Sequence, residues 1–85
     1  MGDTVKITFS DSWTQITGLT TGITYALQNV QSIEAFIQQV PAQPGAGERG
    51  KVLLPFKSAR IIKEESPVWI RSKSGGGTAF YNALP

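Results

Sequence analysis

Short apolar runs alternate with turn-forming residues along the chain, at a spacing of roughly 8–12 residues that is typical of all-β domains. Within each run apolar and polar positions also alternate, as they do in a strand with one buried face. In residues 5–9, for example, Val5, Ile7 and Phe9 fall on the same face. Such runs predict strands over residues 5–9, 13–17, 23–27, 51–54, 59–63, 68–72 and 78–82.

Residues 31–40 fit two structures. Ile33, Phe36, Ile37 and Val40 have the i, i+3, i+4, i+7 spacing of a helix face, which slightly favours a short helix over residues 32–40. In the alternative, Ile33, Ala35 and Ile37 alternate with polar or outward positions of a strand. We adopt the strand because the family resemblance described below favours it.

The fold predicted from these runs is all-β, a single small antiparallel sandwich or barrel of about eight short strands, jelly-roll-like, that forms one domain over residues 1–85. Area scaling indicates that a chain of this length buries roughly 60–65% of its surface on folding. Such a core is thin without a disulfide or a metal to support it, so a partner subunit is a natural source of further stability.

The 85 residues include no Cys and no His. The sequence therefore provides no thiolate nucleophile, no disulfide, no imidazole base and no Cys or His metal ligand. The six Asp and Glu residues are scattered, and nothing local brings them together as a metal or glycosidase site would require. We therefore predict a protein that is not an enzyme and that uses no cofactor and no metal.

The sequence has no apolar stretch near the ~18 residues that a membrane span needs. Its first residues also lack the apolar segment of a signal peptide. We expect no membrane partner and synthesis without export.

Charge is uneven along the chain. Residues 1–47 carry one basic and three acidic side chains, whereas residues 48–85 carry seven basic and three acidic ones. In the basic half, Trp69, Arg71 and Lys73 share one face of a predicted strand, and Val68 and Ile70 share the other. An aromatic beside two cations suits a subunit interface, where Trp and Arg are enriched, better than a platform for single-stranded nucleic acid. Trp13 is a second large aromatic, expected in the core.

Residues 41–50 form a loop rich in Pro and Gly, with two Pro and three Gly in ten positions. Gly45, Gly47 and Gly50 match the G-x-G-x-x-G fingerprint of dinucleotide-binding domains. That chemistry needs a helix to begin at the loop, and Val52-Leu53-Leu54-Pro55 cannot start one. We interpret the segment as a loop whose Glu48 and Arg49 are candidates for contact with a neighbouring subunit.

Residues 19–25 (LTTGITY) resemble the tyrosine corner of fibronectin type III domains, in which a Tyr hydroxyl ties a strand to the preceding turn. That corner belongs late in those domains, and here too few strands precede it. We interpret the segment as a turn that leads into a strand, with Gly22 at positive φ.

The order of several segments resembles small accessory proteins encoded by tailed bacteriophages. The resemblance rests on WTQITGL (13–19), TGITYALQN (21–29), a strand that ends in an Ala/Pro/Gly loop, LLP (53–55), PVWIRS (67–72) and a final Gly-rich hairpin. Residues 31–40 depart most from the expected pattern. The resemblance covers most of the chain, although its motifs are short.

The resemblance implies a non-enzymatic structural protein of the virion, made in the bacterial cytoplasm. It would be a head decoration protein that stabilises the capsid as a homotrimer, with itself and the major capsid protein or other virion proteins as partners. Two alternatives stay open, a carbohydrate-binding or adaptor module of a phage tail or fibre and an OB-like domain that binds single-stranded nucleic acid. The interface candidates are Trp69, Arg71, Lys73, Glu48, Arg49 and Trp13.

Overall fold

The structure, a computed structural model, describes residues 4–84, and this range contains eight strands and no helix. The strands are β1 (Val5–Phe9), β2 (Thr14–Ile16), β3 (Thr24–Asn29), β4 (Ala35–Gln39), β5 (Lys51–Leu53), β6 (Ser58–Ile62), β7 (Val68–Ser72) and β8 (Gly77–Ala83). The all-β prediction is confirmed, and each strand overlaps a segment for which the sequence predicts one.

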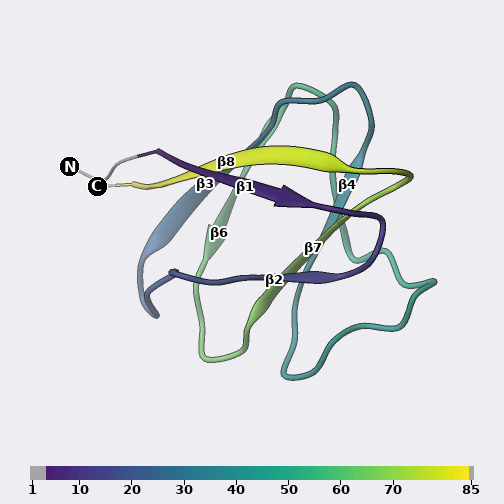
Figure 1. Cartoon of the computed structure of the whole chain (residues 1–85). Coiled ribbons are helices and arrows are strands. Elements are labelled where there is room, and N and C mark those ends of the chain that lie inside the picture. The colour runs from purple at the N-terminus through teal and green to yellow at the C-terminus, as the bar shows by residue number, and fades with distance from the viewer. Residues whose placement is uncertain (1–3, 85) are drawn as a thin grey trace.

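The strands form two four-stranded antiparallel sheets (Figure 1). Sheet A has the order β1-β8-β3-β6, and sheet B has the order β2-β7-β4-β5. Along the chain the strands alternate between the two sheets one by one, except that β4 and β5 both belong to sheet B, and the first strand lies beside the last. This is the strand order of an eight-stranded jelly roll, and the two separate sheets make it a sandwich rather than a closed barrel.

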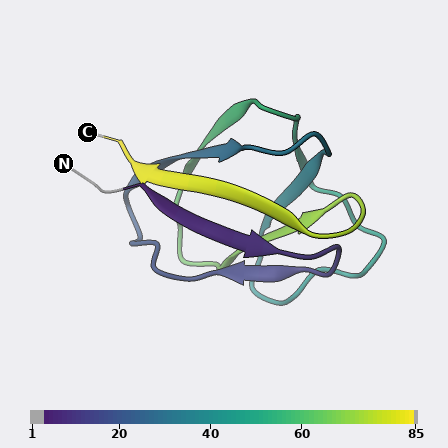
Figure 2. The same cartoon turned by 45° about the horizontal axis from the view of Figure 1, so that its top comes forward.

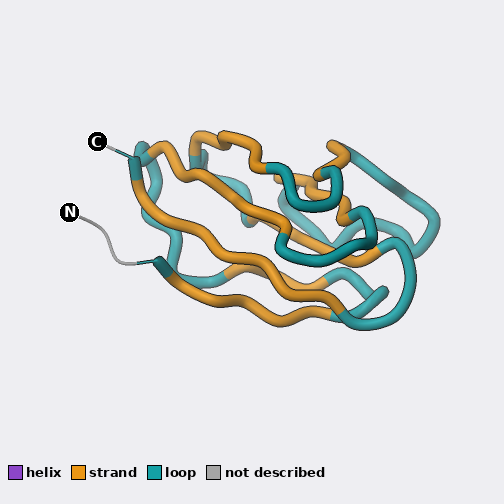
Figure 3. Tube along the Cα trace, turned by 90° about the horizontal axis from the view of Figure 1, so that it is seen from above, coloured by secondary structure: helices purple, strands orange, loops and turns teal. Residues whose placement is uncertain are grey.

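Figure 3 shows the two layers of the sandwich from above, and Figure 2 shows them from an intermediate view. One core lies between the layers. Sheet A contributes Phe9, Tyr25, Leu27, Ala79 and Tyr81, and sheet B contributes Ile16, Ala35, Ile37, Leu53, Val68 and Ile70. These are the alternate positions that the strand pattern places on one face. Val68 and Ile70 are in the core as predicted, so Trp69 and Arg71 lie on the outer face of sheet B.

Residues 35–39 form a strand, so the helix that residues 32–40 also fit does not form. The reason lies in pairing: β4 is central in sheet B, with β7 on one side and β5 on the other. Ala35, Phe36 and Ile37 are all buried, although they alternate between the two faces of the sheet. A segment buried on both faces loses the strict alternation that identifies a strand in the sequence, and its tertiary contacts override helix propensity.

The segment before β3 forms a tyrosine corner in its hydrogen bonding. The backbone N–H of Thr20 donates to the hydroxyl of Tyr25 at 2.8 Å, and the intervening Gly22 has a φ of 92°. The predicted turn with Gly22 at positive φ is confirmed, and the hydroxyl contact accompanies it in a fold other than fibronectin type III. The Tyr25 ring also meets that of Tyr81 edge to face, with 5.7 Å between centroids.

Candidate interaction surfaces

Three large side chains lie in a row across the outer face of sheet B. Arg71 is at the centre, with Phe36 directly opposite it on β4 and Trp13 just before β2. The guanidinium carbon of Arg71 lies 4.6 Å from the centroid of the Phe36 ring and 5.2 Å from that of the Trp13 ring. Both distances are within the range of cation–π attraction, which strengthens when the cation is shielded from water. Arg71 is only 8% exposed, so this row is a second small packed cluster outside the main core.

The Pro/Gly-rich loop, residues 41–50, covers this cluster. The indole N–H of Trp13 donates to the carbonyl oxygen of Gly45 at 2.9 Å. Nε and Nη2 of Arg71 donate to the carbonyl oxygen of Glu48 at 3.2 and 2.8 Å. Pro44, in the same loop, is buried. The loop is thus a fixed cover over Trp13 and Arg71, which offer little surface to another molecule while it is in place.

Gly50 fixes the end of this loop. Its φ is 66°, and a Cβ at this position would lie 2.5 Å from the carbonyl oxygen of Ile37 and 2.4 Å from Cγ of Gln38. The close approach of the two backbones therefore requires glycine here, because any side chain would displace β4. The third glycine of the G-x-G-x-x-G match has this packing role in the structure.

Glu48 and Arg49 are exposed, as expected for the tip of the loop. Each also has an internal contact. The carboxylate of Glu48 accepts a hydrogen bond from the backbone N–H of Gly45 at 2.7 Å, and the guanidinium carbon of Arg49 lies 5.8 Å from the Phe36 centroid.

Trp69 and Lys73 occupy the same outer face further along β7 and beyond its end. Trp69 is half-buried, and its indole N–H donates to the carbonyl oxygen of Val40 at 3.1 Å. Lys73 is exposed and pairs with Glu34 at 3.9 Å. The structure therefore brings four of the six predicted residues, Trp13, Arg71, Glu48 and Arg49, around one cluster, with Trp69 and Lys73 at its margin. Phe36, which completes the cluster, is not among the predicted residues, because residues 31–40 fit both a helix and a strand and the pattern leaves the face of Phe36 undetermined.

A different part of the surface carries exposed apolar side chains. Val52, Leu54 and Phe56 are 42%, 50% and 66% exposed, and they follow one another at every second position through β5 and the turn after it. We call these three residues the apolar strip. Lys51 and Lys57 flank the strip in the sequence, and both are exposed. The sequence signal for it is the apolar run 52–56, which Pro55 interrupts.

Phe56 has an unusual backbone conformation. The N–H of Lys57 donates to the carbonyl oxygen of Leu54 at 3.1 Å, which closes a four-residue turn with Pro55 in second position and Phe56 in third. The φ of Phe56 is 57°, and no other non-glycine residue in the described part of the chain has a positive φ. Turns of this kind normally have Gly or Asn in third position. The chain thus holds an aromatic ring in solvent at a position where its backbone is strained.

The other end of β6 borders an open hollow of about 510 Å³. Its lining comes from the turn before β3, from the last residue of β6 and from the segment after it, namely Thr21, Gly22, Ile62, Lys63, Glu64, Glu65 and Ser66. We call it the β6–β7 hollow. Ile62 is 59% exposed, and Glu64 and Glu65 are exposed beside it.

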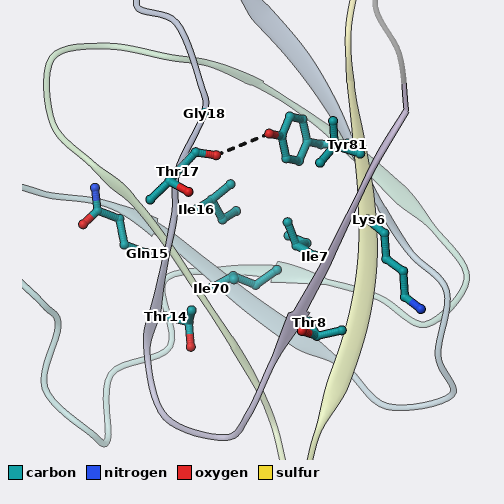
Figure 4. Close-up of a pocket in the computed structure, with 11 residues that line it drawn as sticks. Lys6, Ile7, Thr8, Thr14, Gln15, Ile16, Thr17, Gly18, Ile70 and Tyr81 are labelled. Carbon is teal, nitrogen blue, oxygen red and sulfur yellow. Dashed lines mark hydrogen bonds between the residues drawn. The ribbon is translucent and has the colours of Figure 1, made fainter.

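A second concavity of about 430 Å³ opens between the edge strands β1 and β2 (Figure 4). Ile7, Ile16 and Ile70 point into it, whereas the Lys6 side chain points away. The Tyr81 hydroxyl closes one side by donating to the carbonyl oxygen of Thr17 at 3.3 Å. This concavity is the open edge of the sandwich, where the two sheets separate.

Within residues 4–84, no group of three or more Asp or Glu side chains is placed to hold a metal ion. The same range has no helix that is long and apolar enough to cross a membrane. Comparison with protein-family models, with curated proteins and with solved structures finds no match. The functional proposal below therefore rests on the fold, the surfaces and the segments described above.

Proposed function

We propose that this chain is a non-catalytic structural protein of a tailed-phage virion, in particular a head decoration protein that works as a homo-oligomer. The observation that carries the proposal is the apolar strip. Val52, Leu54 and Phe56 leave three large apolar side chains in water within five residues. Several exposed large apolar side chains within one short segment of a small domain suit a contact with another molecule.

Two further features support this proposal. Eight-stranded jelly rolls occur among viral capsid domains, and this chain has that strand order. The phage resemblance of segments 13–19, 21–29 and 67–72 comes from the sequence and is independent of the topology.

The mechanism follows from mass action. A protein that binds the assembled shell and not its separate subunits lowers the free energy of the assembled state. The gain in stability grows with the concentration of the free protein relative to its dissociation constant, and no chemical step is needed. An oligomer binds with several contacts at once, which raises its overall affinity for a repetitive surface.

Purified phage particles test the proposal directly. The protein should be present in purified particles in a stoichiometric amount and should co-sediment with them. Particles that lack it should lose their DNA at a lower temperature. A protein absent from purified particles of its own phage would contradict the proposal.

A carbohydrate-binding module of a tail or fibre is the second candidate, and the observation that favours it is the half-buried Trp69 on the outer face of sheet B. Aromatic rings in such modules stack on sugar rings. Glycan-array binding that disappears in Trp69→Ala would support this candidate, and a blank array would contradict it. Salt-sensitive binding of single-stranded nucleic acid would indicate the OB-like alternative.

A further inference from the structure

We infer that the apolar strip of one copy of this chain docks into the β6–β7 hollow of a second copy, in a head-to-tail contact. The inference rests on the proposed homo-oligomer and names the two surfaces that would form it. It is carried by four features: a strained and exposed aromatic ring, a hollow of suitable size, opposite charges around the two, and their places in the fold.

Phe56 is the projecting element. It is 66% exposed, the largest exposed fraction among the large apolar residues of the described chain, and it stands on a turn between Leu54 and Lys57. A rigid aromatic ring that enters a pocket is the typical energetic centre of a protein interface. The turn fixes the direction in which the Cα–Cβ bond of Phe56 projects from the surface.

The β6–β7 hollow is the receiving element. Ile62 supplies an exposed apolar side chain, and the hollow around it is wide and shallow, so an aromatic ring can lie against it. A network of hydrogen bonds holds the walls in place: Gly22 N–H donates to the carbonyl of Lys63 at 2.7 Å, and Gln39 of β4 bonds both to the carbonyl of Ile62 and to the N–H of Glu64, at 3.0 and 2.7 Å. The hollow is therefore formed before any partner arrives, which lowers the cost of binding.

The charges around the two surfaces are opposite. Lys57 follows Phe56 directly, whereas Glu64 and Glu65 border the hollow. The ion pair that the structure shows within residues 4–84 joins Lys73 and Glu34, so none of these three charges is paired with another residue of this range. The ammonium of Lys63, the cation beside the hollow, is turned onto the carbonyl oxygens of Glu64 and Ser66.

This charge pattern selects the geometry of the contact. If two strips met around a two-fold axis, Lys57 of one copy would approach Lys57 of the other, and like charges would oppose the contact. If the strip meets the hollow, Lys57 approaches Glu64 and Glu65, and the charges favour it. Charge complementarity therefore points to a second copy in head-to-tail orientation.

The two surfaces lie at opposite ends of β6 (labelled in Figure 1), because the turn with Phe56 precedes the strand and Ile62 ends it. The whole length of β6, four residue steps or about 13 Å of extended strand, separates the turn that carries Phe56 from Ile62. The strip of one copy thus cannot reach the hollow of the same copy. Each copy keeps one free strip and one free hollow until the assembly closes into a ring. A head-to-tail contact of this type produces rings such as trimers.

Complementation of two variants tests the contact. Phe56→Asn removes the ring and retains a residue that accepts positive φ, and Ile62→Lys places a cation in the hollow. Both should be monomeric by size-exclusion chromatography with light scattering, with self-association weakened by about 30-fold or more, as for a hot-spot residue. An equimolar mixture should form a 1:1 heterodimer, in which the intact strip of the Ile62→Lys variant binds the intact hollow of the Phe56→Asn variant. No larger oligomer should form, because no other intact strip or hollow remains in that pair. The control Thr8→Lys, on exposed β1, should assemble as the wild type does.

Charge reversal supplies a second test. Lys57→Glu alone, and Glu64→Lys with Glu65→Lys, should each weaken self-association by about tenfold or more, the effect of 1.4 kcal/mol. The chain with all three substitutions should assemble again, and Lys6→Glu on β1 should have no effect. Circular dichroism of every variant confirms that it is folded.

Three results would overturn the contact: a wild-type chain that stays monomeric at millimolar concentration, a Phe56→Asn variant that still assembles, or a mixture of the two variants that stays monomeric. These outcomes are separate from the test of the proposed function. A protein found in virions although it is monomeric alone would remove only the head-to-tail contact. A head-to-tail oligomer that never associates with virions would remove only the phage role.

Discussion

Arg71 directs two of its N–H groups at a single carbonyl oxygen, that of Glu48, with distances of 3.2 Å from Nε and 2.8 Å from Nη2. This edge of the guanidinium has the geometry that recognises a carboxylate. Here a neutral backbone oxygen of the loop takes that place, while Trp13 and Phe36 flank the cation. The loop and the cluster beneath it consequently stabilise each other.

The first prediction concerns Arg71. Arg71→Lys retains the charge but loses both the forked hydrogen bonds and the planar stacking, so we expect a loss of about 2 kcal/mol in the free energy of unfolding. Urea unfolding measures it. In a Trp69→Phe background the emission of Trp13 should also shift to the red, since the loop no longer shields the indole. Lys73→Arg is the control, because its partner Glu34 forms only an exposed ion pair, and it should change stability by less than about 0.5 kcal/mol.

The second prediction concerns Asn29, which is completely buried. Its amide Nδ2 donates to the carbonyl oxygens of Ile33, Leu53 and Leu54 at 2.9, 3.1 and 3.3 Å, so it joins sheet A to the end of β5. Asn29→Ala should cost about 3 kcal/mol, because it removes the side-chain donor to the buried carbonyl of Leu53, weakens the bonding of two further carbonyls and also creates a cavity.

Asn29→Asp separates these two causes. Asp has nearly the same shape but no amide donor, so it should be at least as destabilising as Ala if the donors matter. Chemical denaturation of both variants gives the comparison. A well-tolerated Asp would contradict the assigned role of the amide.

The third prediction concerns the hydroxyl of Tyr25. Tyr25→Phe removes the acceptor for the N–H of Thr20 and should cost about 1 kcal/mol. Tyr81→Phe is the matched comparison, since its hydroxyl donates over a longer 3.3 Å to the carbonyl oxygen of Thr17 at the side of the concavity between β1 and β2, and we expect a smaller loss. Thermal unfolding of the two variants ranks the bonds, and the reverse order would refute this prediction.

The fourth prediction concerns Phe56 and the stability of the single chain. Phe56→Asn should stabilise the dilute, monomeric protein by about 1 kcal/mol, since Asn accepts a positive φ more readily. Phe56→Gly should gain less, because glycine also increases the entropy of the unfolded chain. Phe56→Ala keeps the backbone strain and serves as the control. Calorimetry at low protein concentration checks the order Asn, Gly, Ala.

The strands follow closely from the sequence because alternation is a local property. Residues 5–9 and 68–72 have one apolar face each, and both form strands with the predicted bounds. The order in which the strands pair is harder to predict from the sequence, since β8 lies between β1 and β3 although it is the last strand in the chain. No local pattern encodes which strands become neighbours across such distances.

The surfaces, too, can be predicted from the sequence only in part. Sequence periodicity correctly places Arg71 on the face opposite Val68 and Ile70, but it does not reveal that residues 41–50 fold over that face. Phe56 is missed because the sequence does not show that its backbone is left-handed or that its side chain lies in solvent. The predicted interface role of Trp69, Arg71, Lys73, Glu48, Arg49 and Trp13 stays a prediction.

The positions of β7 and β8 have a consequence for biosynthesis. These two C-terminal strands are inner strands of sheet B and sheet A, each hydrogen-bonded on both sides. Until they leave the ribosome, β1 and β2 have no neighbour to pair with. The sandwich therefore forms only after β7 and β8 have been synthesised, and the loss of a few residues from β8 would dismantle sheet A rather than fray its edge.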